Sequence, residues 1–142
     1  MASRKIEDLH PKVMEKAKDF LAKCAEQGID VLIYCTYRSQ AEQAELYAIG
    51  RTTPGKIVTN AKPGYSYHNW GLAFDCVPLI NGKPMWDSKN PMWQKLGELG
   101  KSVGLEWAGD WKKFKEYPHF QLALYPIEDL VEKRVDDPFI TN

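Results

Sequence analysis

Apolar and polar residues alternate with two different periods in the first part of the chain, and each period predicts its own kind of element. Residues 11–27 carry apolar side chains three and four positions apart, which predicts an amphipathic helix. Pro11 suits the first turn of this helix, and Gly28 suits the position just after its end. A β-branched apolar run follows at 29–37 and predicts a buried strand.

The middle of the chain predicts a second helix, a long loop and a second strand. Ser39 and Glu42 have the spacing of a capping box, so a helix should begin after Ser39 and end at Gly50. Residues 51–64 are polar and rich in Thr, Pro and Gly. A loop of this length in a compact domain is usually functional or mobile. The apolar residues 72–80 that follow predict a strand.

The rest of the chain predicts shorter elements. These are a hairpin turn at Asn81-Gly82, a short strand at 83–85, a helix from Asn90-Pro91 to about Val103, short strands at 105–108 and 119–124, and a short helix with coil over 127–142. Strands and helices do not alternate as βαβ units. The predicted fold is therefore α+β, with a small, mainly antiparallel sheet and flanking helices.

Size and composition exclude several classes of protein. The 142 residues are enough for a single domain, which we expect to have its core at about 5–124 and a tail at 125–142. The chain has 19 Lys and Arg against 19 Asp and Glu, with 44% hydrophobic residues. This balance argues against disorder, and it gives no electrostatic reason to expect nucleic acid or an anionic membrane as a partner. No apolar run is long enough to span a bilayer.

The three cysteines are expected to be buried free thiols. Cys24 falls on the apolar side of the first helix, and Cys35 and Cys76 lie in apolar strand-like runs. An odd number of cysteines cannot all pair within one chain, and no CxxC spacing is present. The charged N-terminus has no apolar stretch behind it, so the sequence as it stands shows no signal peptide.

Two of the three histidines lie in settings that favour chemistry. His68 closes a loop, and Asp75 follows seven residues later in the predicted strand, whose other face is wholly apolar. His119 shares a strand face with Gln121. Two imidazoles and one carboxylate make a zinc site when a fourth position stays open for water. The spacing alone is weak, however, so structural roles for the same residues stay open.

A zinc site of this kind also needs a base and an oxyanion partner. Glu116 is the natural base because it lies close to His119, and Arg38 is the natural partner for the oxyanion. Residues three apart point to opposite faces of a regular strand, so Glu116 must precede the strand or lie on a bend. Pro118 makes a bend there plausible because it restricts the residue before it.

Two motifs resemble those of the VanY-type zinc peptidases, which include D-alanyl-D-alanine carboxypeptidases and the L-alanyl-D-glutamate peptidases that phages use as endolysins. They are S-x-H-x-x-G-x-A-x-D at 66–75 and E-x-P-H-F-Q at 116–121. The similarity continues in residues 37–43, 51–55 and 107–111, and covers roughly residues 5–124. It implies the small α+β fold that D-Ala-D-Ala peptidases share with hedgehog domains.

The resemblance also implies roles for individual residues. These are zinc binding by His68, Asp75 and His119, general base and acid catalysis by Glu116, oxyanion stabilisation by Arg38, and lining of the cleft by Gln43 and Ser66. Endopeptidases of the family often have Asp where this chain has Glu116, which is a modest departure. The segment from Trp107 to Trp111 resembles a cleft wall, although core packing explains Trp107 equally well.

By this resemblance, the chain is a zinc-dependent endopeptidase that cleaves the L-Ala–D-Glu bond of the peptidoglycan stem peptide. We expect a monomeric phage endolysin, made in the host cytoplasm without a signal peptide and acting on the cell wall after release by a holin. Its partner is the stem peptide, without nucleic acid or stable membrane association. The alternatives are a D-alanyl-D-alanine carboxypeptidase and a wall-binding domain that keeps zinc but lacks turnover. The presence of both Glu116 and Arg38 favours an enzyme.

Overall fold

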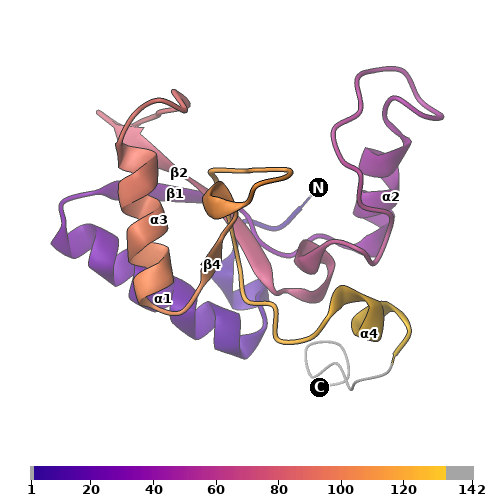
Figure 1. Cartoon of the computed structure of the whole chain (residues 1–142), viewed down its shortest axis with the longest axis horizontal. Coiled ribbons are helices and arrows are strands. Elements are labelled where there is room, and N and C mark those ends of the chain that lie inside the picture. The colour runs from indigo at the N-terminus through magenta and orange to yellow at the C-terminus, as the bar shows by residue number, and fades with distance from the viewer. Residues whose placement is uncertain (1, 134–142) are drawn as a thin grey trace.

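A five-stranded antiparallel sheet lies at the centre of the computed structural model, which describes residues 2–133 (Figure 1). Its strands are β1 (Asp30–Cys35), β2 (Ala73–Ile80), β3 (Lys83–Pro84), β4 (Glu106–Trp107) and β5 (His119–Gln121). The main path runs β1-β2-β5-β4, and β3 pairs with the far end of β2. Every pairing is antiparallel, which confirms the predicted type of sheet.

The helices begin and end close to where the local sequence predicted. They are α1 (Pro11–Glu26), α2 (Gln40–Ala48), α3 (Met92–Ser102) and α4 (Ile127–Val131), with short 3₁₀ helices η1 (Ile6–Asp8), η2 (Tyr67–Trp70) and η3 (Ala108–Asp110). The capping box of Ser39 and Glu42 is present, and Gly28 follows α1 in the left-handed conformation with φ 70°. These caps confirm the predicted helix ends.

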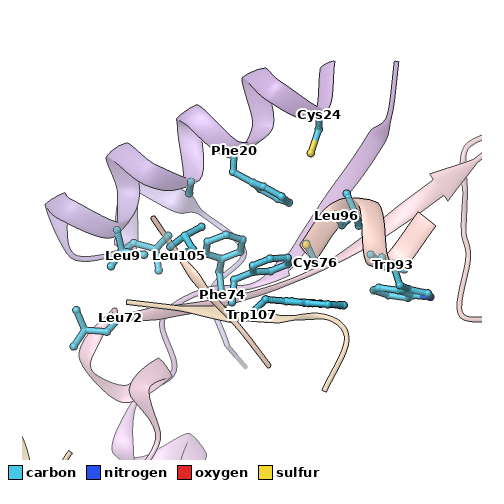
Figure 2. Packing of buried hydrophobic residues seen from close by; sticks show 14 of the residues in the cluster. Leu9, Phe20, Cys24, Leu72, Phe74, Cys76, Trp93, Leu96, Leu105 and Trp107 are labelled. Carbon is cyan, nitrogen blue, oxygen red and sulfur yellow. The ribbon is translucent and has the colours of Figure 1, made fainter. Parts of the chain in front are cut away.

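The hydrophobic core lies between the sheet and the two helices α1 and α3 (Figure 2). Phe74 of β2 stacks on Phe120 of β5 with 5.6 Å between ring centroids, and Phe20 of α1 packs against both rings. A Cβ atom on Gly97 of α3 would lie 2.3 Å from the ring of Trp107, so only glycine allows α3 to approach the sheet this closely. Trp107 is thus a core residue.

Several elements differ from the prediction in extent. The strand predicted at 119–124 ends at Gln121, because the chain turns where the amide of Leu124 bonds the carbonyl of Leu122. The strand predicted at 105–108 shortens to β4 and passes directly into η3. His68 lies on η2 rather than at the end of a loop. The coil predicted after α4 falls on residues 134–142, outside the described part of the chain.

Two further expectations concern the cysteines and membrane-spanning segments. All three cysteines are buried free thiols, as their apolar surroundings predicted. Between residues 2 and 133, the helices are all too short or too polar to cross a membrane.

Candidate functional site

The face of the sheet opposite the core carries a row of polar side chains. Asp75 of β2 pairs directly with His119 of β5, so their side chains project next to each other from the same face. Two positions along β5, Gln121 pairs with Ala73 on one side and with Glu106 of β4 on the other. Strand alternation that buries Phe74 and Phe120 on one face therefore gathers these polar groups on the other.

The 3₁₀ helix η2 brings His68 to this row. Ser66 caps the start of η2, and Gly71 ends it with a left-handed φ of 69°. The Nδ1 atom of His68 lies 2.8 Å from the carbonyl oxygen of Thr36. Because a carbonyl oxygen only accepts, Nδ1 carries a hydrogen, and in the neutral ring the lone pair is therefore on Nε2. Nε2 lies 3.3 Å from Oδ1 of Asp75.

A series of hydrogen-bonded side chains orients the ring of His119, as the carbonyl of Thr36 orients the ring of His68. Glu106 accepts hydrogen bonds from Nε2 of Gln121 at 3.0 Å and from the indole of Trp111 at 3.1 Å. The amide oxygen of Gln121 therefore points to Nε2 of His119, 2.7 Å away, and accepts its hydrogen. This leaves the lone pair on Nδ1 of His119, which lies 3.0 Å from Oδ1 of Asp75.

Two imidazole lone pairs and one carboxylate thus converge, and we call His68, Asp75 and His119 the donor set. The two rings are 5.1 Å apart between centroids, and only 4% and 7% of His68 and His119 is exposed. Hydrogen bonding of each outer ring nitrogen is the usual support for metal-binding histidines. The donor set accordingly fits a zinc ion in both its atoms and its support.

Electrostatics also favour a cation at the donor set. Burial raises the pKa of Asp75, but His68 and His119 outweigh burial and hold that pKa well below its usual value. Burial lowers the pKa of His68, but the carboxylate of Asp75 more than offsets this and raises the pKa to about 10. Asp75 therefore stays ionised and attracts a positive charge, carried either by protonated His68 or by a metal ion.

Cys35 is a neighbour of the site that sequence reasoning did not identify. Its sulfur, His68 and Asp75 offer atoms within 4.8 Å of one another. The sulfur lies 3.7 Å from Nδ1 of His68, the nitrogen that is bonded to Thr36. The thiol therefore contacts the side of the ring that does not face Asp75, and we place Cys35 among the surroundings of the donor set.

Arg38 and Gln43 lie together at the start of α2. Arg38 donates to Oε1 of Gln43 at 3.0 Å and contacts the sulfur of Cys35 at 3.4 Å. Gln43 is fully buried and donates to the carbonyl of Ala61 at 2.8 Å. Gln43 therefore links Arg38 to the loop before η2 from a buried position, whereas the resemblance implied that it lines the cleft.

Glu116 and Ser66 border the donor set from two loops. Glu116 precedes β5, as strand geometry required, and its Oε2 lies 3.9 Å from Nδ1 of His119. Its side chain is 60% exposed, so the carboxylate can rotate in solvent. The hydroxyl of Ser66 accepts from the backbone N–H of His68 at 3.3 Å, which orients the start of η2.

Two cavities border the donor set. The first has a volume of about 380 Å³, and we call it the aromatic cavity. Its lining includes the aromatic side chains of Tyr34, Trp86, Trp93 and Tyr117. The second, of about 470 Å³, we call the arginine cavity, and its polar lining includes Arg38, Thr59, Tyr65, Ser66 and Trp111. Asp75, Glu116 and His119 line both cavities. An extended chain that crosses the donor set can therefore occupy space on either side.

The structure places His68, Asp75, His119 and Glu116 close together, while their roles stay a prediction, and the sequence assigned no supporting role to the groups that hold them. No sequence motif marks these supporting and neighbouring residues, which are Tyr34, Thr36 and Glu106. Strand alternation placed Gln121 on the same face as His119, and this was the sequence signal for the contact between the Gln121 amide and the His119 imidazole.

Sequence comparison finds related peptidases. A family model described as D-alanyl-D-alanine carboxypeptidase matches residues 59–122. The peptidoglycan L-alanyl-D-glutamate endopeptidase CwlK of Bacillus subtilis is 45% identical over 123 residues, which cover 81% of this chain and 74% of CwlK. An L-alanyl-D-glutamate peptidase of Listeria phage A118 is 34% identical over 107 residues, which cover 74% of this chain and 34% of that protein.

Structure comparison agrees on the fold. The L-Ala D-Glu endopeptidase ChiX of Serratia marcescens matches with a TM-score of 0.64 and 22% identity, over 86% of this chain and 88% of ChiX. The extent of the similarity to CwlK, together with the motifs around the donor set, shows that this chain belongs to the M15 family of peptidases.

Proposed function

We propose that this protein is a zinc-dependent endopeptidase that hydrolyses the L-Ala–D-Glu bond in the stem peptide of bacterial peptidoglycan. The observation that carries the proposal is the convergence of two imidazole lone pairs and one carboxylate oxygen, with the carboxylate of Glu116 3.9 Å from His119. The 45% identity to CwlK, itself an L-alanyl-D-glutamate endopeptidase, supports the choice of bond.

The donor set would hold the metal through Nε2 of His68, Nδ1 of His119 and the carboxylate of Asp75. Zinc, when bound, polarises a peptide carbonyl and lowers the pKa of water. Thr36 and Gln121 keep the outer ring nitrogens protonated, so in its neutral form each imidazole turns its lone pair toward the metal position.

Glu116 would act as the general base and then as the general acid. Its carboxylate accepts a proton from the attacking water and returns that proton to the departing amine. Its place on an exposed bend supports this role, because the carboxylate can face first the water and then the leaving group.

Arg38 would stabilise the negative charge that develops on the carbonyl oxygen. Its guanidinium group lines the arginine cavity, and Gln43 fixes its orientation from the buried side. A cation that is already oriented needs little rearrangement as the charge forms, which is the basis of oxyanion stabilisation.

A biological role in host lysis, with holin-type release from the host cytoplasm, extends the proposal. The 34% identity to a phage peptidase supports this role. CwlK is a bacterial protein, so remodelling of a bacterium's own wall is the second candidate.

Mass spectrometry of digested muropeptides tests the choice of bond. We expect a new N-terminal D-Glu on the released stem peptide, and far less of this product from Glu116→Gln in the same digestion time. Release of free D-Ala with the stem intact would instead assign the carboxypeptidase activity that the matching family model describes. No product from zinc-loaded protein would favour the non-catalytic wall-binding alternative.

A further inference from the structure

The aromatic cavity contains a connected set of rings that the proposed chemistry does not use. Tyr34 contacts Trp86 edge-on at 5.6 Å between centroids, Trp86 contacts Trp93 at 6.3 Å, and Trp93 stacks on Tyr117 at 6.2 Å. Trp93 is buried, whereas 57% of Trp86 is exposed. Trp86 therefore offers a large apolar surface at the edge of the active site.

The walls of this cavity are held in place by the fold. The indole of Trp93 donates to the carbonyl of Asp87 at 3.0 Å, and the indole of Trp107 donates to the carbonyl of Tyr117 at 2.8 Å. Tyr34 lies at a register shift between β1 and β2, an irregularity often found beside active sites. The rings of Trp93, Tyr117 and Tyr34 therefore form a preformed wall, against which the exposed ring of Trp86 packs.

The two cavities differ in a way that matches the two sides of the substrate. On the amino side of the L-Ala–D-Glu bond, the alanine is joined through a lactyl group to an N-acetylated sugar, and neither carries a charge. On the carboxyl side, D-Glu and the residues beyond it carry free carboxylates. The positive charge of Arg38 attracts carboxylates to the arginine cavity, and the hydroxyls of Ser66 and Thr59 can donate to them there.

A sugar suits the aromatic cavity for a complementary reason. The faces of aromatic rings are electron-rich, so they attract the weakly positive C–H groups on the flat side of a sugar ring. Ser88 and Lys115 also line this cavity and can bond the hydroxyl and acetamide groups at the edge of the sugar. The aromatic cavity takes Trp93 from α3, the arginine cavity takes Leu46 from α2, and these helices lie at opposite sides of the molecule (Figure 1).

We propose that the aromatic cavity binds the N-acetylated sugar that bears the stem peptide, with Trp86 as its stacking surface, and that D-Glu and the following residues occupy the arginine cavity. This inference rests on the proposed L-Ala–D-Glu activity. Binding of the sugar makes the enzyme selective for stem peptides that are still attached to the glycan strand.

The test compares two substrates that share the scissile bond. One is a stem tetrapeptide attached to N-acetylmuramic acid, and the other is the same tetrapeptide with a simple N-acetyl group. For the unaltered protein, kcat/KM should be higher for the sugar-bearing substrate. Trp86→Ala should lower the ratio of the two kcat/KM values about tenfold, mainly through KM, as expected for loss of one ring contact. Trp86→Phe should keep most of the ratio.

Tyr65→Ala, from the arginine cavity, is the matched control, because Tyr65 is also partly exposed, at 44%. It should leave the ratio unchanged. A ratio unchanged in Trp86→Ala, or one that falls in Tyr65→Ala instead, would overturn the assignment of the cavities. Failure of the unaltered protein to cleave either substrate at L-Ala–D-Glu would overturn the proposed function itself, a result visible before any variant is made.

Discussion

The donor set and the groups that surround it differ sharply in how they are held. His68 and His119 are almost fully buried, and each has its outer ring nitrogen bonded to a fixed acceptor. Glu116, only 3.9 Å from His119, is 60% exposed and lies on a bend. The loops nearby also expose apolar side chains, with Val58 at 61% and Phe114 at 74%.

This difference separates two tasks of one site. The proposed metal ligands need a fixed geometry before the metal arrives, and they project from β2, β5 and η2, which pack against the core (Figure 2). A proton carrier must face water and then a leaving group, so it benefits from freedom on a loop. Under the proposed function, the fold thus provides a buried half of the site for the metal and an exposed half for the proton transfer.

The largest effect should come from a change in the exposed half of the site alone. Glu116→Gln should lower kcat by about a hundredfold to ten-thousandfold, the usual contribution of a positioned acid and base. Zinc content and melting temperature should not change, because the donor set is untouched. Stopped-flow or discontinuous turnover assays with metal analysis of the same samples measure both properties.

A neighbouring exposed residue provides the control for that experiment. Lys113→Gln changes one exposed side chain of the same loop and should leave kcat unaltered. Turnover near the normal rate in Glu116→Gln would remove Glu116 from the base role.

A smaller effect should follow when the support of the buried half is weakened. Gln121→Leu removes the acceptor for Nε2–H of His119, and loss of such a support lowers metal affinity about tenfold to a hundredfold. Competition with a coloured chelator measures the zinc affinity without any substrate.

The role of Gln121 can also be separated from a general loss of stability. Phe120 lies next to it but packs into the core, so Phe120→Leu should lower the melting temperature with little effect on zinc affinity at temperatures where the protein is folded. Equal zinc affinity in Gln121→Leu and the unaltered protein would show that His119 needs no such support.

Features fixed by local chemistry were predictable from the sequence. The capping box at Ser39 and the glycine after α1 act within a few residues, so both helix ends were found where expected. The position of Glu116 before β5 followed from the alternation of side chains along a strand and from the neighbouring Pro118. The α+β class and the antiparallel sheet followed from the order of the elements.

Features that depend on contacts between distant segments were not predictable in the same way. The pairing of Asp75 with His119 joins residues 44 positions apart, and no local pattern sets that register. The link between Glu106 and Gln121 requires the register of β4 on β5. The shift at Tyr34 changes the alternation of β1, which is why its place in the aromatic cavity could not be read from the pattern.

A crystal grown with zinc would show whether the donor set holds the metal. Diffraction data collected on both sides of the zinc absorption edge reveal where the metal lies. We predict one strong anomalous peak, in contact with Nε2 of His68, Nδ1 of His119 and the carboxylate of Asp75. A peak bound instead by the sulfur of Cys35, or no peak at these side chains in zinc-loaded crystals, would contradict the account.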